Sequence, residues 1–365
     1  MYLNFYKERE HVLEPSVPVV PPLSSNLSLI ESGKDAWLLS HGKDCSKQVV
    51  RSQKCVQLGA ETTGLFTHTF FECLSSWPHK NPAEAALSAW MFLKTMGVDP
   101  NRLYVKCPPT DKDIWRRMGW PDNQLSEGQT SIHWLAGTGC DTELWRLSSV
   151  SVTDGEVVHY GCCGGLERLT AAVNDMGSNY QTDLFAPLLR TIERQTGAPT
   201  YRDDHAALNQ TYRLVADHVR TVSVCLGDGM FPDFNQSLRA LTKQLVLACN
   251  QGLFLPDGIK ASETELAWAY DNTKRLLLDL CDVNGEVLGD TYPELTQSKI
   301  KTVLEHEVDH FKQQDLGGDN LMPTLQRECP PLAGMIDEKD ASLFQDALQV
   351  MDDHEGNEID NRFSI

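Results

Sequence analysis

A glycine-rich turn joins a strand-like segment to a helix-like segment near the middle of this chain. Residues 164–169 read Gly-Gly-Leu-Glu-Arg-Leu, with the strand-like residues 156–160 before them and the helix-like residues 169–173 after them. Glycines allow a backbone to approach a ligand closely. Arg168 stands at the junction, where its planar guanidinium can hold a phosphate. Many such turns bind nothing, so the weight of this turn depends on the segments around it.

Four further segments surround the turn in a fixed order. They are Ser-Gln-Lys-Cys-Val at 52–56, His-Thr-Phe-Phe-Glu at 68–72, Ser-Asn-Tyr-Gln-Thr-Asp-Leu-Phe at 178–185 and Tyr-Arg-Leu-Val-Ala-Asp-His-Val-Arg-Thr at 212–221. Together with the turn, they resemble the N-terminal half of alanyl-tRNA synthetase over about residues 1–315, with gaps. Residues 223–226 and 228–232 resemble the animal mitochondrial form more than the others.

The resemblance implies an α+β fold. It predicts a class II synthetase antiparallel sheet with flanking helices, at about 1–196, followed by a helical tRNA-recognition-like domain at 200–315. Residues 316–365 are expected to form a partly helical acidic tail, with a helix at 341–351, and the editing and C-terminal domains are expected to be absent. Strands are predicted at 48–50, 68–73, 102–107 and 157–160, and helices at 83–96, 111–118, 237–250 and 263–281.

An apolar stripe from Leu208 to Leu226 recurs at helical spacing. It predicts a helix packed in a core. The later segment 263–281 carries Trp268 and Tyr270 on its own stripe, which predicts the same role.

The synthetase resemblance implies a site that binds ATP, with Mg²⁺ if the site is active. Activation of a carboxylate with ATP needs positive charge where pyrophosphate leaves. Arg168 would face the γ-phosphate, and Glu72 would join it as a catalytic residue. His68 and Gln57 stand at the remaining nucleotide-binding positions.

Two of the implied positions are changed in this chain. Gln57 replaces the arginine that the family places in a Cys-Val-Arg-Ala-Gly-Gly segment, and loss of such a clamp costs about 3 kcal/mol or more of transition-state stabilisation. Residues 161–163 read Gly-Cys-Cys where the family has Asp-Thr-Gly. The acidic residue should pair with the amino group of alanine, and a buried ammonium without a counter-charge is costly.

Two loops of the family pattern are also altered. The Gly-Pro-Cys-rich loop survives only as residues 137–143, and residues 78–82 replace a Gly-Asp-Tyr-Phe-Lys stretch. We therefore expect alanine activation to be lost or weak, with a structural or regulatory role in its place. An active alanine–tRNA ligase, or a ligase repurposed for another amino acid, are the alternatives.

Binding of the tRNA acceptor stem depends on basic side chains that neutralise phosphates. The family has an arginine-dense helix where residues 237–250 lie here, and only Arg239 and Lys243 remain as tRNA-binding candidates. The chain carries 51 acidic and 32 basic side chains, for a net charge of −19, which repels nucleic acid at long range. We expect weakened binding of the alanine tRNA acceptor stem, with a protein partner or a dimer as the other possibility.

Residues 1–7 lack the Arg- and Ser-rich, acid-poor composition of a mitochondrial presequence. A mitochondrial location is therefore implied by the resemblance alone, with the cytoplasm as the alternative. The sequence does not say whether residue 1 is the natural N-terminus. The sequence contains no run of 18 apolar residues, so no membrane-spanning helix is predicted. The 11 cysteines have no secretory signal before them, so we expect reduced thiols.

Residues 306–310 read His-Glu-Val-Asp-His, which matches the zinc-protease pattern. A third ligand would be needed, and the segment falls where the family has an acidic helix. We expect a solvated helix face and no metal site.

Overall fold

The computed structural model describes residues 1–22, 25, 27–42, 47–58, 64–153, 157–232, 235–255 and 261–316. By their internal contacts the residues divide into two compact units, Met1–Phe185 and Ala186–Ile365. Whether the domain boundaries predicted from the sequence mark independently folding domains stays a prediction. The helix predicted at 341–351 lies outside the described residues.

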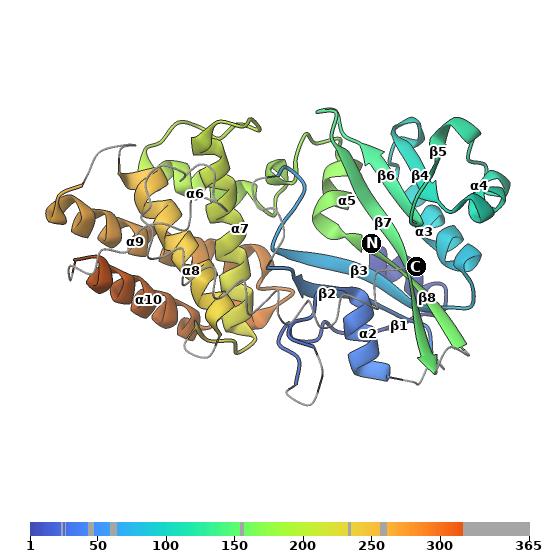
Figure 1. Cartoon of the computed structure of the whole chain (residues 1–365), viewed down its shortest axis with the longest axis horizontal. Helices are drawn as coiled ribbons and strands as arrows, with labels where there is room; N and C mark the ends of the chain where they lie inside the picture. Colours follow the sequence, from blue (N-terminus) through green and yellow to red (C-terminus); the bar gives the residue numbers. More distant parts are fainter. Residues whose placement is uncertain are drawn as a thin grey trace. The chain divides into compact units, whose positions relative to one another are not determined.

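The first unit is built on one eight-stranded sheet (Figure 1). Its strand order is β1-β2-β3-β8-β7-β6-β4-β5, and every neighbouring pair is antiparallel except β1 with β2 and β4 with β5. The strands are β1 Val12–Leu13, β2 Val49–Val56, β3 Phe70–His79, β4 Leu103–Cys107, β5 Leu125–Glu127, β6 Ser131–Leu135, β7 Asp141–Thr153 and β8 Val157–Gly165. The predicted antiparallel sheet with flanking helices is confirmed.

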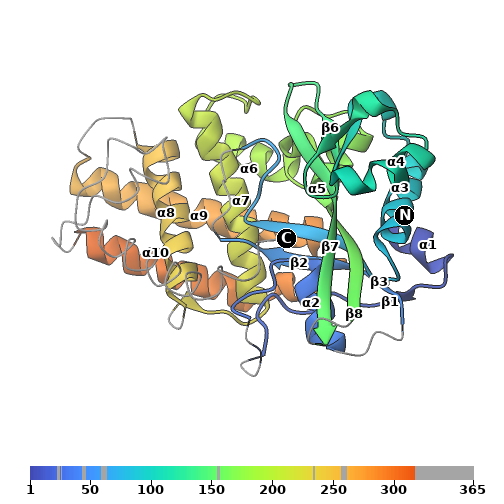
Figure 2. The same ribbon diagram turned by 45° about the vertical axis from the view of Figure 1, so that its right-hand side comes forward.

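Helices cover both faces of this sheet (Figure 2). Those of the first unit are α1 Tyr2–Lys7, α2 Gly33–His41, α3 Pro82–Met96, α4 Lys112–Arg117 and α5 Leu166–Val173. One core unites α1, α3 and α5 with the sheet and includes Tyr6, Phe92, Trp145 and Leu169. Two smaller clusters lie on the opposite side, where Ala36 and Trp37 of α2 pack against β2 and β3.

Local sequence signals set the ends of α3. The Asn81 side chain accepts a hydrogen bond from the Glu84 N–H at 2.9 Å, and Pro82 occupies the first turn. Gly97 ends the helix in the left-handed region with φ of 76°. Its apolar residues, such as Ala89 and Phe92, recur on the buried side.

The second unit is helical in the residues that the structure describes. Its helices are α6 Ala186–Thr196, α7 Ala207–Gly227, α8 Gln236–Cys249, α9 Glu263–Leu288 and α10 Ser298–Leu316. The predicted core stripe on α7 is confirmed from Tyr212 to Leu226, which are buried. The same expectation is wrong for Trp268 of α9, which is 53% exposed although its neighbour Tyr270 is buried.

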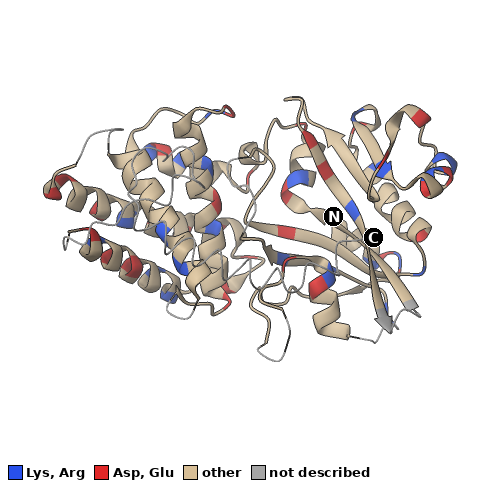
Figure 3. Ribbon diagram, in the orientation of Figure 1, with Lys and Arg blue, Asp and Glu red and all other residues tan. Residues whose placement is uncertain are grey.

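Basic and acidic residues both occur along α9 and α10 (Figure 3), and ion pairs join the two helices. Lys274 Nζ lies 2.5 Å from Asp309 Oδ1, and Lys312 Nζ lies 2.6 Å from Asp271 Oδ1. These pairs reduce the positive charge that the two helices present. None of the described helices is long and apolar enough to span a bilayer.

Candidate functional site

One face of the sheet carries a row of polar side chains from β2 to β4. Direct cross-strand partners run Arg51, Ser75, Cys163, Arg146, Ser131 and Lys106. Directly opposed residues of neighbouring strands point to the same side of a sheet. The row therefore marks one continuous face, with the core around Trp145 on the other side.

The first part of this face lies beneath α2. We call it the covered half, and its residues are Cys55, Cys73, Trp77, Gly161 and Cys163. A Cβ added at Gly33, the first residue of α2, would lie 2.3 Å from Ser75 Cβ and 3.3 Å from Cys163 Sγ. The first turn of α2 therefore rests directly on β3 and β8.

Indole rings complete the covered half. A Cβ at Gly161 would lie 2.1 Å from ring carbons of Trp77. Trp77 in turn stacks on Trp37 of α2, with ring centroids 5.4 Å apart and planes 19° apart. Gly161 is thus fixed by packing, because any larger side chain would overlap the ring.

The thiols of the covered half are poor nucleophiles. A hydrogen bond with Cys73 and burial both raise the pKa of Cys163 well above its ordinary value. Burial also raises the pKa of Cys55. Thiolates are the reactive form of cysteine, so this cluster acts as apolar packing.

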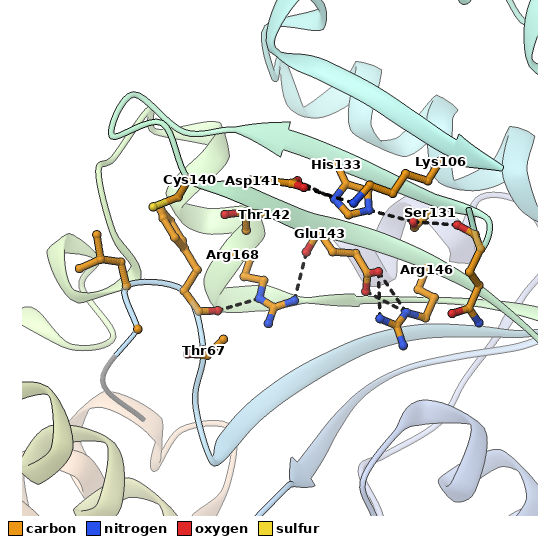
Figure 4. Close-up of a pocket in the computed structure, with 14 residues that line it drawn as sticks. Thr67, Lys106, Ser131, His133, Cys140, Asp141, Thr142, Glu143, Arg146 and Arg168 are labelled. Carbon is orange, nitrogen blue, oxygen red and sulfur yellow. Dashed lines mark hydrogen bonds and ion pairs between the residues drawn. The ribbon is translucent and has the colours of Figure 1, made fainter. Parts of the chain in front are cut away.

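The second part of the face opens into a pocket of about 570 Å³. We call it the open half. Its polar groups come from β4, β6, β7 and the start of α5, and the loop before β3 closes one side (Figure 4). Lys106, Arg146 and Arg168 supply positive charge there, and Asp141 and Glu143 supply negative charge.

Arg168 is anchored in the wall of this pocket. Its Nε donates to the Phe66 carbonyl at 2.8 Å and its Nη1 donates to the Glu143 carbonyl at 3.2 Å. Burial lowers the pKa of Arg168 from its ordinary value, while the nearby carboxylates of Glu143 and Glu167 raise it. The guanidinium stays charged, since an arginine pKa begins far above neutrality.

Glu143 and Arg146 form a forked ion pair at the pocket rim. Arg146 Nε and Nη2 each lie 3.0 Å from a Glu143 carboxylate oxygen. Next to them, His133 lies between Ser131 and Asp141, with contacts at 2.9 and 2.7 Å. Sequence reasoning missed Lys106, Ser131, His133 and Arg146, although the alternation of polar and apolar residues at 131–134 is a strand signal.

The other residues predicted for the site lie apart from Arg168. Gln57 follows β2, is exposed, and donates through Nε2 to the Glu31 carbonyl at 3.2 Å. Glu72 alternates with Cys73 on β3, so its side chain points to the opposite face, where Ser52 Oγ donates to it at 3.3 Å. The structure therefore does not bring Glu72 and Arg168 onto one face.

His68 is held in an aromatic enclosure. Its ring stacks on Phe185 with centroids 4.5 Å apart and meets Tyr180 edge-on at 5.3 Å. Its Nε2 lies 2.8 Å from Asn179 Nδ2. These contacts position the loop before β3, and a nucleotide-binding role for His68 stays a prediction.

Gly164 of the central turn is required by packing. A Cβ there would lie 2.4 Å from the Trp145 ring, whereas one at Gly165 would meet only Arg168 carbons at 3.8 Å. The close backbone approach expected for a ligand is therefore made by a core indole at Gly164.

The tRNA-binding candidates lie on α8. Arg239 Nη2 lies 3.6 Å from Glu307 Oε1 of α10, and the Arg239 side chain is partly exposed. Lys243 lies one turn further along and is partly buried. Arg239 is thus partly neutralised by an acidic residue within the same unit.

Glu307 belongs to the zinc-protease-like segment, and it is buried against Arg239. The expectation of a solvated helix face is therefore wrong for Glu307, although His306 is 71% exposed. The His306 and His310 rings are stacked with centroids 6.5 Å apart. Among the described residues, no group of three or more His, Cys, Asp or Glu is placed to hold a metal.

Comparison with known proteins agrees with this architecture. The family model for class II (A) tRNA synthetases matches residues 1–148 and 156–245. The mitochondrial alanine–tRNA ligase of Drosophila melanogaster is 30% identical over 402 aligned residues, which cover 90% of this chain and 38% of the relative.

Other relatives are similar at comparable levels. The human mitochondrial alanine–tRNA ligase is 30% identical, over 82% of this chain and 36% of its own length. The alanine–tRNA ligase of Staphylococcus epidermidis is 26% identical, over 94% of this chain and 44% of its own length. The chain thus spans less than half the length of these curated relatives. Taken with the sheet order and the strand–turn–helix at Arg168, the match shows that this chain belongs to the class II (A) tRNA synthetase family, with alanine–tRNA ligases as its relatives.

Proposed function

We propose that this chain is an alanyl-tRNA synthetase-like protein of mitochondrial type in which alanine activation is lost or weak, and that it serves a structural or regulatory role. The observation that carries the proposal is the packing of the covered half. The family's acidic position is Gly161 here, and the space above it is taken by Trp77.

The amino group of alanine would lack a counter-charge at this position. Cys163, where the family has glycine, places a thiol between Cys73 and the N-terminus of α2. An ammonium entering this region would lose its hydration and meet an indole ring and a neutral thiol. Burial of an unpaired charge is costly, so alanine binding there is disfavoured.

The phosphate clamp is incomplete as well. Gln57 is neutral, and its amide already donates to a backbone carbonyl. A neutral amide cannot replace a guanidinium fork that holds a phosphate through two charge-assisted bonds. Stabilisation of the charge that develops at the α-phosphate is therefore reduced.

The open half retains features that suit ATP. Lys106, Arg146 and Arg168 together favour an anion, and they would hold the outer phosphates of ATP, with Mg²⁺ if the metal accompanies it. The two carboxylates of the pocket, on Asp141 and Glu143, already accept bonds from His133, Lys106 and Arg146. The contrast between the closely packed covered half and the charged open half therefore supports binding of ATP without activation of an amino acid.

Binding of the alanine tRNA acceptor stem is expected to be weak, because Arg239 is paired with Glu307 and few other cations remain on α8. A protein partner or a second copy of the chain would then take the place of tRNA. A mitochondrial location is part of the proposal and is supported by the relatives of that compartment.

ATP–pyrophosphate exchange tests the proposal directly. The chain is assayed with alanine and a panel of other amino acids, beside a working alanyl-tRNA synthetase as a positive control. A second arm carries Gln57→Arg, and a third carries Gln57→Arg with Trp77→Leu and Gly161→Asp. We expect no exchange from the unmodified chain or from Gln57→Arg.

The outcomes separate the alternatives. Exchange with alanine at a rate near the control would overturn the proposal and show a working alanine–tRNA ligase. Exchange with a different amino acid would show a repurposed ligase. Exchange gained only in the triple variant would show that the covered half is the barrier.

A further inference from the structure

The open half contains a serine, a histidine and an aspartate in hydrogen-bonded order (Figure 4). Ser131 and His133 are two residues apart on β6 and therefore point to the same face. Ser131 Oγ lies 2.9 Å from His133 Nε2, and His133 Nδ1 lies 2.7 Å from Asp141 Oδ1. The two ring nitrogens thus face a hydroxyl and a carboxylate, as nucleophilic catalysis by serine requires.

The imidazole is fixed by its surroundings. Tyr104 stacks on it with centroids 5.1 Å apart and planes 25° apart. Burial raises the pKa of Asp141, but hydrogen bonds from Tyr104, His133 and Lys106 lower it by more. The pKa of Asp141 therefore lies below its ordinary value. Asp141 is therefore ionised at neutral pH and can accept a hydrogen bond from His133 Nδ1. In that arrangement the other ring nitrogen, Nε2, faces Ser131 Oγ as the acceptor.

A basic side chain lies on each side of the hydroxyl, and each is also paired with a carboxylate of the pocket. Ser131 is the direct cross-strand partner of Arg146 on β7 and of Lys106 on β4. Cations near a reacting carbonyl stabilise the oxyanion that forms when it is attacked. They also attract a substrate that carries negative charge.

Ser131 has access to the pocket and a choice of acceptors. It is 3% exposed and lines the pocket beside His133 and Asp141. Its Oγ also lies 3.0 Å from the Gln129 carbonyl. The hydroxyl proton can rest on that carbonyl and turn to His133 when a substrate arrives.

We propose that Ser131, His133 and Asp141 hydrolyse carboxylic esters that carry an anionic group, an activity separate from amino-acid activation. Ser131 Oγ forms a bond to the ester carbon while its proton passes to His133 Nε2 and the carbonyl electrons move to oxygen. The ester C–O bond then breaks, and the leaving alkoxide takes the proton from His133. Water attacks the acyl-serine by the same route, releasing a carboxylic acid and restoring Ser131.

The first test is covalent labelling of the full chain with a fluorophosphonate, a serine-directed probe. Peptide mass spectrometry locates the adduct. We expect one adduct on Ser131 and a labelling rate lower by about a hundredfold or more in His133→Gln. Ser149→Ala removes an exposed serine of β7 outside the relay and is expected to leave labelling unchanged.

Asp141 acts through His133, so its test needs a readout beyond folding. We expect Asp141→Asn to slow labelling while the thermal midpoint stays near that of the unmodified chain, and Asp141→Glu to recover part of the rate. Ser131→Ala is expected to abolish the adduct, and should that variant fail to fold, His133→Gln and the two Asp141 variants carry the test. A folded protein that gives no adduct on Ser131, or one that His133→Gln does not slow, overturns the proposal.

Hydrolysis of p-nitrophenyl esters defines the substrate class. The monoanionic succinate half-ester is compared with the neutral acetate. We expect faster turnover of the half-ester than of the acetate. The ratio of the two rates should fall by at least about tenfold in Arg146→Gln. Equal turnover of both esters, unchanged by Arg146→Gln, would overturn the assignment to anionic esters.

Discussion

The covered half and the open half lie on one face of one sheet, yet they differ in almost every physical property. Under α2, two indole rings and three thiols fill the space above β3 and β8. Position 161 accepts only glycine, because a Cβ there would overlap the Trp77 ring. Beyond β8, charged groups surround a pocket. The difference shows that one cross-strand row can supply a closely packed region and an open polar pocket on the same face of a sheet.

The largest effect is expected where the covered half is tightest. Gly161→Ala places a Cβ 2.1 Å from the Trp77 ring, and we expect it to lower the free energy of unfolding by about 3 kcal/mol. Urea unfolding followed by tryptophan fluorescence measures this, because seven of the eight tryptophans lie in Met1–Phe185.

Two controls sharpen this result. Gly137→Ala lies in the turn beside the open half, where an added Cβ would meet only Arg102 Nη2 at 3.9 Å, so a cost below about 0.5 kcal/mol is expected. In a Trp77→Leu background, Gly161→Ala should cost less by at least about 1 kcal/mol. Equal costs at Gly161 and Gly137 would show that the covered half yields as easily as a loop.

A smaller effect is expected at the anchored arginine of the open half. Arg168→Gln removes the bonds to the Phe66 and Glu143 carbonyls, and we expect a loss of about 2 kcal/mol because both donors are charged. The same urea experiment measures it. No measurable change in the free energy of unfolding would mean that these two hydrogen bonds do not contribute to stability.

Thiol reactivity should divide along the same line. The pKa values of Cys55, Cys73 and Cys163 are raised, so little thiolate exists near pH 8, whereas Cys140 lines the pocket. We expect iodoacetamide to modify Cys140 at least about tenfold faster, since rate follows thiolate fraction and access. Site-resolved mass spectrometry of the native chain checks this, and rapid modification of Cys163 would contradict the covered state.

The smallest effect is expected at the pocket rim. Arg146→Gln breaks the fork with Glu143, but the Arg146 side chain is about half exposed, so we expect a stability loss below about 1 kcal/mol. Unfolding in urea at low and high salt measures it. A loss as large as that of Arg168→Gln would show that the open half is as rigid as the covered half.

Much of the fold could be predicted from the chain alone. The family resemblance carried by the ordered segments around Arg168 implied the antiparallel sheet and the helix α8, and apolar periodicity predicted the buried face of α7. The strands β6 and β7 were missed, although residues 131–134 of β6 alternate between polar and apolar as a half-buried strand does. Trp268 was misjudged because periodicity alone does not say whether a neighbouring helix covers a given stripe.

The candidate site was predicted less well. Arg168 was singled out by the glycine-rich turn and the segments around it, and the structure places it in the pocket wall. Its role towards the γ-phosphate stays a prediction. The relay from Ser131 to Asp141 depends on the register of two strands joined by a turn, and register follows from three-dimensional pairing. The absence of an acidic group at Gly161 could be read from the sequence, but the ring that fills the space comes from β3, more than eighty residues earlier.

The contact between Trp77 and Gly161 also constrains how this chain can change over generations. A carboxylate at position 161 would overlap the indole, so Gly161→Asp alone is expected to destabilise the packing between β3 and β8. Trp77 must become smaller first, and that step alone leaves a cavity against Trp37. Any route to a carboxylate at position 161 therefore passes through a less stable protein, which favours retention of the present pair of residues.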